Sequence, residues 1–260
     1  MPQPKQRSAA APTRGAGVLS RMVQVAGELL ITAGVILLLF VAWQLWWTNV
    51  ESDAKQRDVI KDFAQDLKTV PAAPSTAASA DSSAAYGPAT VAAEPAAGGT
   101  IGILYVPRFG ADYTRPIVQG TTAGVLDSLG IGHYAGTAMP GAVGNFAVAG
   151  HRQTHGAVLD NIDSLVPGDR IYVQTKDGYY VYEFRNSEIV LPSRTDVLLP
   201  VPTQPAATPK ESYLTMTSCN PRFGSQERII AYSLLERWQP ASAGPPPEIS
   251  AQVARTTGQG

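Results

Sequence analysis

Cys219 is the single cysteine of the 260-residue chain, and it ends a segment whose residues favour a β-strand. That segment is Tyr213-Leu-Thr-Met-Thr-Ser218, and Asn220-Pro221 follows the cysteine and stops the strand pattern. A thiol at a strand end beside a loop can be exposed and act as a nucleophile once it is deprotonated. One cysteine also excludes a disulfide framework, a four-cysteine zinc site and an iron–sulfur cluster.

Two further residues have the chemistry that a cysteine nucleophile needs. Arg228 comes nine residues after Cys219 and opens a second apolar strand pattern, so an antiparallel hairpin would bring the two together at its open end. A guanidinium there favours a thiolate and donates hydrogen bonds to an oxyanion. His151 follows the apolar segment Asn145–Ala149 through Gly150, at a position expected at a strand end. An imidazolium stabilises a thiolate and then protonates a leaving amine.

The elements that must position these residues lie in Thr100–Trp238, 139 residues that are enough for one core. Apolar and β-branched segments predict strands at Ile101–Val106, Pro116–Val118, Asn145–Ala149, Arg170–Thr175, Tyr179–Val190, Tyr213–Ser218 and Arg228–Leu235. Short helices are expected near Thr122–Leu129, Val158–Leu165 and Arg194–Leu199. Many short strands at this spacing favour an all-β barrel or sandwich over a parallel α/β sheet.

Three ordered motifs resemble the sortase family. They are Gly130-Ile-Gly-His-Tyr-Ala-Gly-Thr-Ala-Met-Pro-Gly141, Gly144-Asn-Phe-Ala-Val-Ala-Gly-His-Arg152, and Thr215-Met-Thr-Ser-Cys219 with Arg228. The first motif and the apolar N-terminal segment most resemble the class E sortases of high-GC Gram-positive bacteria. In the family's Thr-Leu-x-Thr-Cys signature, Met216 stands for Leu and Ser218 for Thr. The resemblance covers about residues 100–236.

This resemblance implies a closed eight-stranded β-barrel with short helices, preceded by one transmembrane helix. It implies that Cys219, His151 and Arg228 form the catalytic set. It also implies that Thr217 and Ser218 line the groove for the substrate, and that Tyr134 sets a preference for alanine in the substrate motif. No metal ligand set and no cofactor are expected.

The activity that the resemblance implies is transpeptidation at the cell surface. Cys219 would cleave a Leu-Ala-x-Thr-Gly or Leu-Pro-x-Thr-Gly sorting signal between Thr and Gly and form an acyl-thioester. An amine of a peptidoglycan precursor or a pilin lysine would then take the acyl group. The partners are therefore surface proteins or pilins with a sorting signal. Because the formal net charge is −1, nucleic acid is not expected as a partner.

Residues 29–47 predict a membrane anchor. These 19 residues carry no charge, and a helix of that length spans roughly 28 Å, close to the thickness of the hydrocarbon core. Trp43, Trp46 and Trp47 stand at its end, where aromatic rings favour the headgroup layer. Residues 1–28 form a basic tail, so the positive-inside rule predicts a cytoplasmic N-terminus and an extracellular catalytic domain in the plasma membrane.

The other segments differ in composition from the catalytic domain, 100–238. Residues 48–69 are highly charged and predict a juxtamembrane helix that continues the anchor as an extracellular stalk. Residues 70–99 are almost wholly Ala, Pro, Ser, Thr and Gly, which predicts a disordered linker. Residues 239–260 predict a disordered C-terminal tail on the same grounds.

Other functions fit the sequence less well. Papain-like hydrolases place the cysteine before the histidine, and L,D-transpeptidases have glycine directly before the cysteine, where this chain has Ser218. A zinc module could use His151 and His155, which are four residues apart, with Cys219. However, glycines bracket the two histidines, and no Glu lies between them. An inert membrane-anchored adhesin or scaffold would require an unreactive Cys219.

Overall fold

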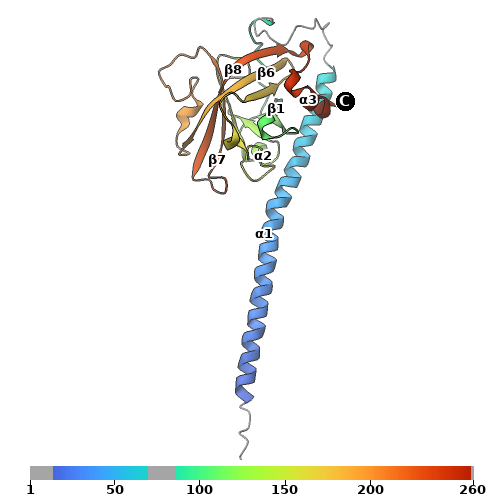
Figure 1. The fold of residues 1–260 in the computed structure, drawn as a ribbon, viewed down its shortest axis with the longest axis vertical. Helices are drawn as coiled ribbons and strands as arrows, with labels where there is room; N and C mark the ends of the chain where they lie inside the picture. Colours follow the sequence, from blue (N-terminus) through green and yellow to red (C-terminus); the bar gives the residue numbers. More distant parts are fainter. Residues whose placement is uncertain (1–13, 70–85, 259–260) are drawn as a thin grey trace, which may run out of the picture. The chain divides into compact units, whose positions relative to one another are not determined.

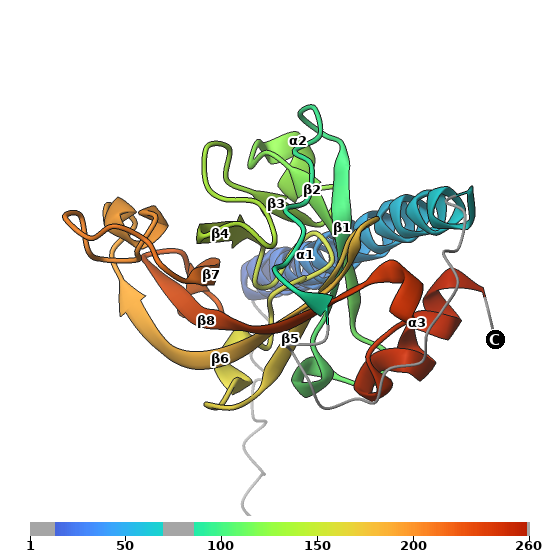
Figure 2. The same cartoon turned by 90° about the horizontal axis from the view of Figure 1, so that it is seen from above.

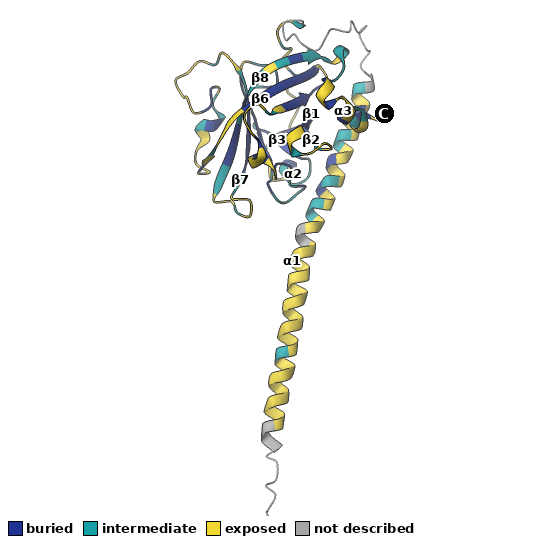
Figure 3. Cartoon of the chain, viewed as in Figure 1, coloured by how far each residue is buried: buried dark blue, intermediate teal, exposed yellow. Residues whose placement is uncertain are grey.

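The computed structural model describes residues 14–69 and 86–258, and the chain divides into two compact units, Met1–Trp47 and Thr48–Gly260. The described part of the first unit belongs to helix α1 (Arg14–Thr69), whose side chains there are almost all exposed (Figure 3). The exposed residues are large and apolar, including Leu30, Ile31, Leu38 and Trp46. Within the described residues, α1 is the one helix long and apolar enough to cross a membrane. It therefore suggests a membrane anchor, in the segment where the sequence predicts one.

The second unit contains a closed eight-stranded β-barrel, which confirms the predicted fold class (Figure 1). Its strands are β1 (Thr100–Tyr105), β2 (Thr114–Gln119), β3 (Ile131–His133), β4 (Gly144–Ala149), β5 (Arg170–Gln174), β6 (Gly178–Val190), β7 (Ser212–Asn220) and β8 (Glu227–Pro240). Around the barrel they follow the order β1-β2-β3-β4-β7-β8-β6-β5. The pairs β2–β3 and β4–β7 are parallel, and the other pairs are antiparallel. Figure 2 shows the long, curved β6 and β8 running side by side.

Seven of the eight strands coincide with the strands that the sequence predicts, because each has a run of apolar or β-branched residues. The strand that the sequence missed is β3, which has three residues inside the glycine-rich motif. Gly132 is required there, because an added Cβ would lie 2.3 Å from the carbonyl oxygen of Gly120. The barrel interior is filled by one apolar cluster that includes Ile117, Phe146, Leu214 and Tyr182, each almost fully buried.

The predicted short helices are present but shorter than expected. They are α2 (Ala123–Leu126) and two 3-10 turns, η3 (Ile162–Ser164) and η4 (Thr195–Leu198). A further 3-10 turn, η2 (Pro107–Phe109), follows β1. All four connect strands of the barrel, so they shape the loops rather than the core.

The predicted linker at 70–99 is wrong in its second half. Residues 70–85 lie outside the described residues, whereas residues 86–99 pack on the barrel without regular structure. Trp238 Nε1 donates a hydrogen bond of 2.9 Å to the Gly87 carbonyl, and the Tyr180 hydroxyl donates one of 2.6 Å to the Thr90 carbonyl. Ala92 is buried in the core cluster. Small residues can therefore be ordered where large barrel side chains provide the apolar surface and the donors.

The predicted disordered tail at 239–260 is also wrong over most of its length. After β8 the chain forms η5 (Ala241–Ala243), η6 (Pro247–Ile249) and helix α3 (Ser250–Thr257). Ile249 and Val253 are buried in a second apolar cluster on the outside of the barrel, with Tyr105 and Tyr172. Two apolar residues four positions apart are too few to predict an amphipathic helix in a Pro- and Ala-rich sequence. Ile249 and Val253 order this segment because they pack against apolar residues of the barrel.

Candidate active site

The predicted nucleophile and the predicted arginine are cross-strand neighbours. In the β7–β8 ladder, Cys219 pairs with Arg228. The pair lies next to the connecting loop 221–226 rather than at the open end of the hairpin, because β7 ends and β8 begins at this loop. Cys219 is a free, partly exposed thiol. A cross-strand pair at a loop lets both side chains face the same solvent-accessible site.

His151 follows β4, which runs parallel to β7. The last pair in that ladder is Ala149 with Thr217, and the Gly150 amide donates a hydrogen bond of 3.1 Å to the Thr217 carbonyl. His151 and Cys219 each come two residues after that last pair. Because adjacent strands lie about 4.8 Å apart, the register brings the histidine and the cysteine to the same end of two neighbouring strands.

Asp127 is a member of the site that the sequence did not reveal. Its carboxylate accepts a 2.7 Å hydrogen bond from His151 Nε2, and it lies 3.9 Å from His155 Nε2. The two imidazole rings have centroids 5.0 Å apart. Asp127 directly follows α2, 24 residues before His151. No sequence pattern connects it to the histidine, so only the folded barrel makes the contact visible.

Arg152 also contributes to the site, although the sequence gave it no role. It is buried, and its Nη1 donates to Asn220 Oδ1 at 2.7 Å and to the Cys219 carbonyl at 3.4 Å. Its Nη2 lies 2.7 Å from a carboxylate oxygen of Asp163. A buried guanidinium needs such partners, because an unpaired one is costly. Arg152 therefore fixes the end of β7 that carries the thiol.

The Arg228 guanidinium is held at the hairpin loop. Its Nη1 donates to the Ser225 carbonyl at 2.9 Å and to the Glu227 carbonyl at 2.8 Å. Neither partner is charged, so the positive charge is not neutralised by either contact. The side chain is partly exposed beside Cys219, where a guanidinium can meet an anionic group.

The three predicted substrate-contacting residues are close together but differ in exposure. The hydroxyls of Tyr134 and Thr217 are hydrogen-bonded at 2.9 Å, and Tyr134 is partly exposed whereas Thr217 is buried. Ser218 is also buried, and its hydroxyl donates 2.8 Å to the Gly150 carbonyl. This bond ties β7 to the residue before His151. The contacts with substrate predicted for these three residues stay predictions.

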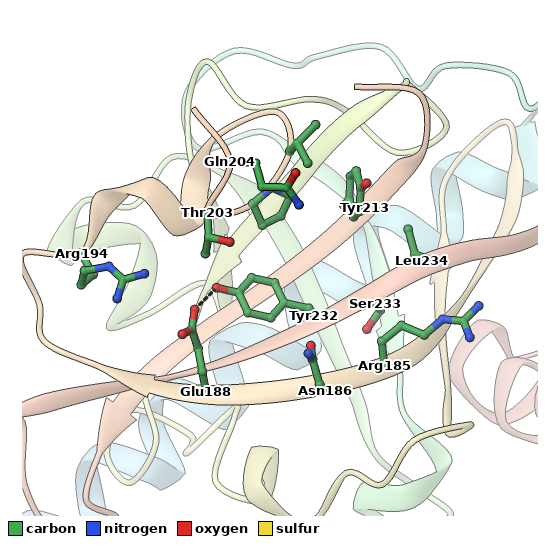
Figure 4. Close-up of a pocket in the computed structure, with 12 residues that line it drawn as sticks. Arg185, Asn186, Glu188, Arg194, Thr203, Gln204, Tyr213, Tyr232, Ser233 and Leu234 are labelled. Atoms are coloured by element: carbon green, nitrogen blue, oxygen red, sulfur yellow. Dashed lines mark hydrogen bonds between the residues drawn. The ribbon is translucent and has the colours of Figure 1, made fainter. Parts of the chain in front are cut away.

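A separate hollow of about 420 Å³ lies away from these residues (Figure 4). It is formed by β6, β7, β8 and the residues around η4, and its walls are both polar, as at Arg185 and Gln204, and apolar, as at Val201 and Leu234. The Tyr232 hydroxyl donates a 2.6 Å hydrogen bond to Glu188 across it. Cys219, His151 and Arg228 are not among its lining residues, so this hollow is separate from the candidate site.

Comparison with known proteins identifies the family. Residues 104–236 match the sortase domain. The chain belongs to the sortase family. Sortase SrtE1 of Streptomyces coelicolor is 36% identical over 248 residues, which cover 93% of this chain and 64% of that protein. Sortase SrtE2 of the same species is 33% identical over 247 residues, covering 89% of this chain and 90% of the relative.

A solved sortase structure agrees with the fold. The crystal structure of Sortase E1 from Streptomyces coelicolor with a tripeptide in the active site has 38% sequence identity and a TM-score of 0.54, and the match covers 58% of this chain and 97% of that one. The predicted resemblance to class E sortases is thus confirmed. Sortases are cysteine transpeptidases, the enzyme class that the sequence predicts. The present sortase spans 64% of the length of SrtE1.

The sortase site also contains three side chains that are close enough together to bind a metal ion. Donor atoms of Asp127, His151 and His155 all lie within 4.8 Å of one another. Two imidazoles and a carboxylate are ligand types that suit zinc. In this sortase the hydrogen bond between Asp127 and His151 Nε2 joins two of these three side chains directly. The arrangement therefore fits an oriented imidazole at least as well as a zinc ligand set.

His133 of the sortase motif has a structural environment. The ring is fully buried, with Nδ1 2.7 Å from Gln119 Oε1 and Nε2 2.9 Å from the Thr137 hydroxyl. Burial lowers the pKa of His133, although the Ala138 carbonyl and the charge of Glu94 act in the opposite direction. The neutral imidazole is therefore the folded form.

We expect His133 to make stability depend on pH. As the pH falls below about 6.5, the unfolded chain binds a proton at this histidine before the folded chain does, so the free energy of unfolding decreases. His133→Gln replaces the imidazole by an amide, which can still form hydrogen bonds but does not bind a proton in this pH range. Thermal unfolding of the full chain in detergent at pH 7.5 and pH 5.5 should show a smaller drop in Tm for His133→Gln than for the wild type. His155→Gln, at a partly exposed histidine, is the matched control, and equal drops in all three proteins would contradict the assignment.

Proposed function

We propose that this sortase is a membrane-anchored transpeptidase in which Cys219 is the nucleophile, His151 the general acid and base, and Arg228 the group that stabilises the oxyanion. The observation that carries the proposal is the pairing of Cys219 with Arg228 at a strand end that adjoins the end of β4. A thiol, a guanidinium and an imidazole at one rim of the barrel are the groups that acyl transfer requires.

The reaction proceeds in two acyl transfers. The Cys219 thiolate attacks the carbonyl carbon of Thr in the sorting signal, and the negative charge that develops on the oxygen is met by the Arg228 guanidinium. As the C–N bond to Gly breaks, His151 gives its proton to the leaving amine, and an acyl-thioester remains on Cys219. An acceptor amine then attacks the thioester and loses a proton to His151. The new amide leaves, and Cys219 returns to the thiolate.

Asp127 and Arg152 support these roles. The Asp127 carboxylate at 2.7 Å fixes the orientation of the His151 ring, as a carboxylate does in other catalytic imidazole pairs. Arg152 binds the Cys219 carbonyl and Asn220, so the strand end keeps its position while the thiol reacts. Both residues act on the reactive groups and not on the substrate.

The sortase acts outside the cell in this proposal. The basic segment before the apolar helix would stay in the cytoplasm, and the barrel would face the cell wall. Substrates are then surface proteins or pilins with a C-terminal Leu-Ala-x-Thr-Gly or Leu-Pro-x-Thr-Gly signal, and the acceptor is an amine of peptidoglycan precursor or of a pilin.

A transfer assay tests the function. The full chain in detergent micelles is given a Leu-Ala-Glu-Thr-Gly peptide and a glycine-based amine, and products are identified by mass spectrometry. We expect the Thr–amine conjugate and free Gly peptide. Absence of both, or stoichiometric zinc bound through His151 in the same preparation, would contradict the proposal.

Tyr134 is proposed to favour alanine over proline in the second position of the signal. Removing its hydroxyl breaks the bond to Thr217 and changes the wall beside Cys219. In Tyr134→Phe we expect the ratio of kcat/KM for Leu-Ala-Glu-Thr-Gly over Leu-Pro-Glu-Thr-Gly to fall by about 3- to 10-fold, the net contribution of one hydrogen bond. Tyr232→Phe, which removes a hydroxyl at the separate hollow, is the matched control and should leave the ratio unchanged. An unchanged ratio in Tyr134→Phe would assign selectivity to other residues.

A further inference from the structure

The membrane-proximal part of α1, residues 48–69, packs one side against the barrel although it carries many charged side chains. Within the second unit, one face of this helix is buried or partly buried, and the opposite face is exposed (Figure 3). The residues of that face recur every three or four positions: Ser52, Gln56, Ile60, Phe63 and Leu67. This spacing places all five on one side of a helix. We call it the docking face.

The apolar half of the docking face attaches the helix to the barrel. Phe63 is 3% exposed and belongs to the outer apolar cluster with Tyr105, Tyr172 and Val253, and Ile60 and Leu67 pack against the same cluster. Burying a phenylalanine side chain contributes roughly 1.5–3 kcal/mol. Hydrophobic contact therefore holds this end of the helix on β1, β5, β6 and α3.

The polar half of the docking face contacts the two segments that carry the site. Ser52 donates a 2.7 Å hydrogen bond to the Asp127 carbonyl. Gln56 Nε2 donates to the His155 carbonyl at 3.3 Å, and Asn49 Oδ1 accepts from the Gly156 amide at 2.9 Å. Ser52 and Gln56 are 3% and 1% exposed, so these bonds are shielded from water. Shielded hydrogen bonds hold position better than exposed ones.

From these contacts we infer that Ser52 and Gln56 are positioning residues for His151, and that the anchor helix thereby completes the active site. Ser52 fixes the backbone of Asp127, whose carboxylate orients the His151 ring. Gln56 fixes the carbonyl of His155, whose ring lies beside that of His151. The inference rests on the proposed role of His151.

Removing the Ser52 or Gln56 side chain should affect the kinetics of transfer in a specific way. Neither Ser52 nor Gln56 adjoins Cys219, so their removal should leave peptide binding intact and slow the steps that need the His151 proton. Alanine is the best helix former, so Ser52→Ala and Gln56→Ala keep α1 helical. A merely structural contribution would lower stability without separating kcat from KM.

The test compares Ser52→Ala and Gln56→Ala with Gln65→Ala. This control makes the same Gln-to-Ala change as Gln56→Ala, but on the exposed side of the same helix. In the full chain in detergent micelles, we expect kcat for transfer to fall about 5- to 20-fold in the first two variants, with KM changed less than about twofold. Gln65→Ala should match the wild type. A double variant Ser52→Ala with Asp127→Asn should lose less than the product of the two single losses, because both act through one histidine. The inference would be overturned by an unchanged kcat in Ser52→Ala and Gln56→Ala. It would also be overturned if the loss in the double variant equalled the two single losses multiplied together.

A second measurement does not depend on turnover. The chain has only three histidines, so the imidazole ¹⁵N resonances can be assigned by His→Gln variants. Ser52→Ala should shift the His151 resonances, which report tautomer and hydrogen bonding, and leave those of buried His133 in place. Unshifted His151 resonances would overturn the inference even if the wild type transferred no peptide. A wild type that fails to transfer while these resonances shift would contradict the proposed function alone.

Discussion

Cys219→Ala should abolish peptide transfer, with a loss of more than about 10³-fold in kcat/KM, because no other thiol in the chain can form the thioester. The fold should survive, since Cys219 is partly exposed and lies at a strand end. The full chain in detergent, given peptide and amine, is assayed by mass spectrometry of the conjugate. Tm is measured on the same samples.

Ser218→Ala is a neighbouring comparison. It removes the bond to the Gly150 carbonyl but leaves the thiol, so we expect a lower Tm and a loss of transfer far smaller than in Cys219→Ala. Transfer that survives Cys219→Ala at the wild-type rate would contradict the mechanism, whatever the behaviour of Ser218→Ala.

Arg228→Ala should reduce kcat by about 10²- to 10³-fold, the loss found when one donor to an oxyanion is removed. Arg228→Lys keeps a charge but not the planar fork of donors, and we expect a smaller loss of about tenfold. The comparison measures kcat and KM separately for each variant. Because the side chain pairs with Cys219 across the strands, both variants act at the thiol and not through the barrel core.

Arg222→Ala provides the matched arginine control for Arg228. Arg222 is an exposed residue of the loop 221–226 that precedes Arg228, and it is paired with Asp160 at 2.7 Å. Exposed ion pairs contribute at most about 1 kcal/mol to stability. We expect kcat within about twofold of the wild type. Equal losses in Arg222→Ala and Arg228→Ala would show that Arg228 supplies only general charge.

Sequence patterns predicted the barrel, and they singled out Cys219 and Arg228 as candidate site residues, because both inferences depend on local signals. Alternating apolar residues mark β6, β7 and β8, and the turn at Lys176-Asp177-Gly178 joins the β5–β6 hairpin. The pairing of Cys219 with Arg228 then follows from counting residues in one hairpin. The family resemblance grouped His151 with Cys219, but the parallel β4–β7 ladder that brings their strand ends together is seen only in the structure, because no local pattern predicts it.

The residues that the sequence missed act through contacts between distant segments. Asp127 lies 24 positions before His151, and Ser52 lies 75 positions before Asp127. The charge of residues 48–69 concealed the docking face, because Ile60, Phe63 and Leu67 are three apolar residues among many charged ones. In the same way, segment 86–99 and the C-terminal residues lack their own apolar surface and are ordered by the surface of the barrel.

Trapping the acyl-enzyme tests the central claim most directly. The full chain is mixed with Leu-Ala-Glu-Thr-Gly peptide without an amine, quenched in acid within seconds, and digested for mass spectrometry. We expect the Leu-Ala-Glu-Thr acyl group to be attached to Cys219, to be released by hydroxylamine, and to be absent in Cys219→Ala. Gly release with no acyl group on Cys219, or an acyl group on another residue, would contradict it.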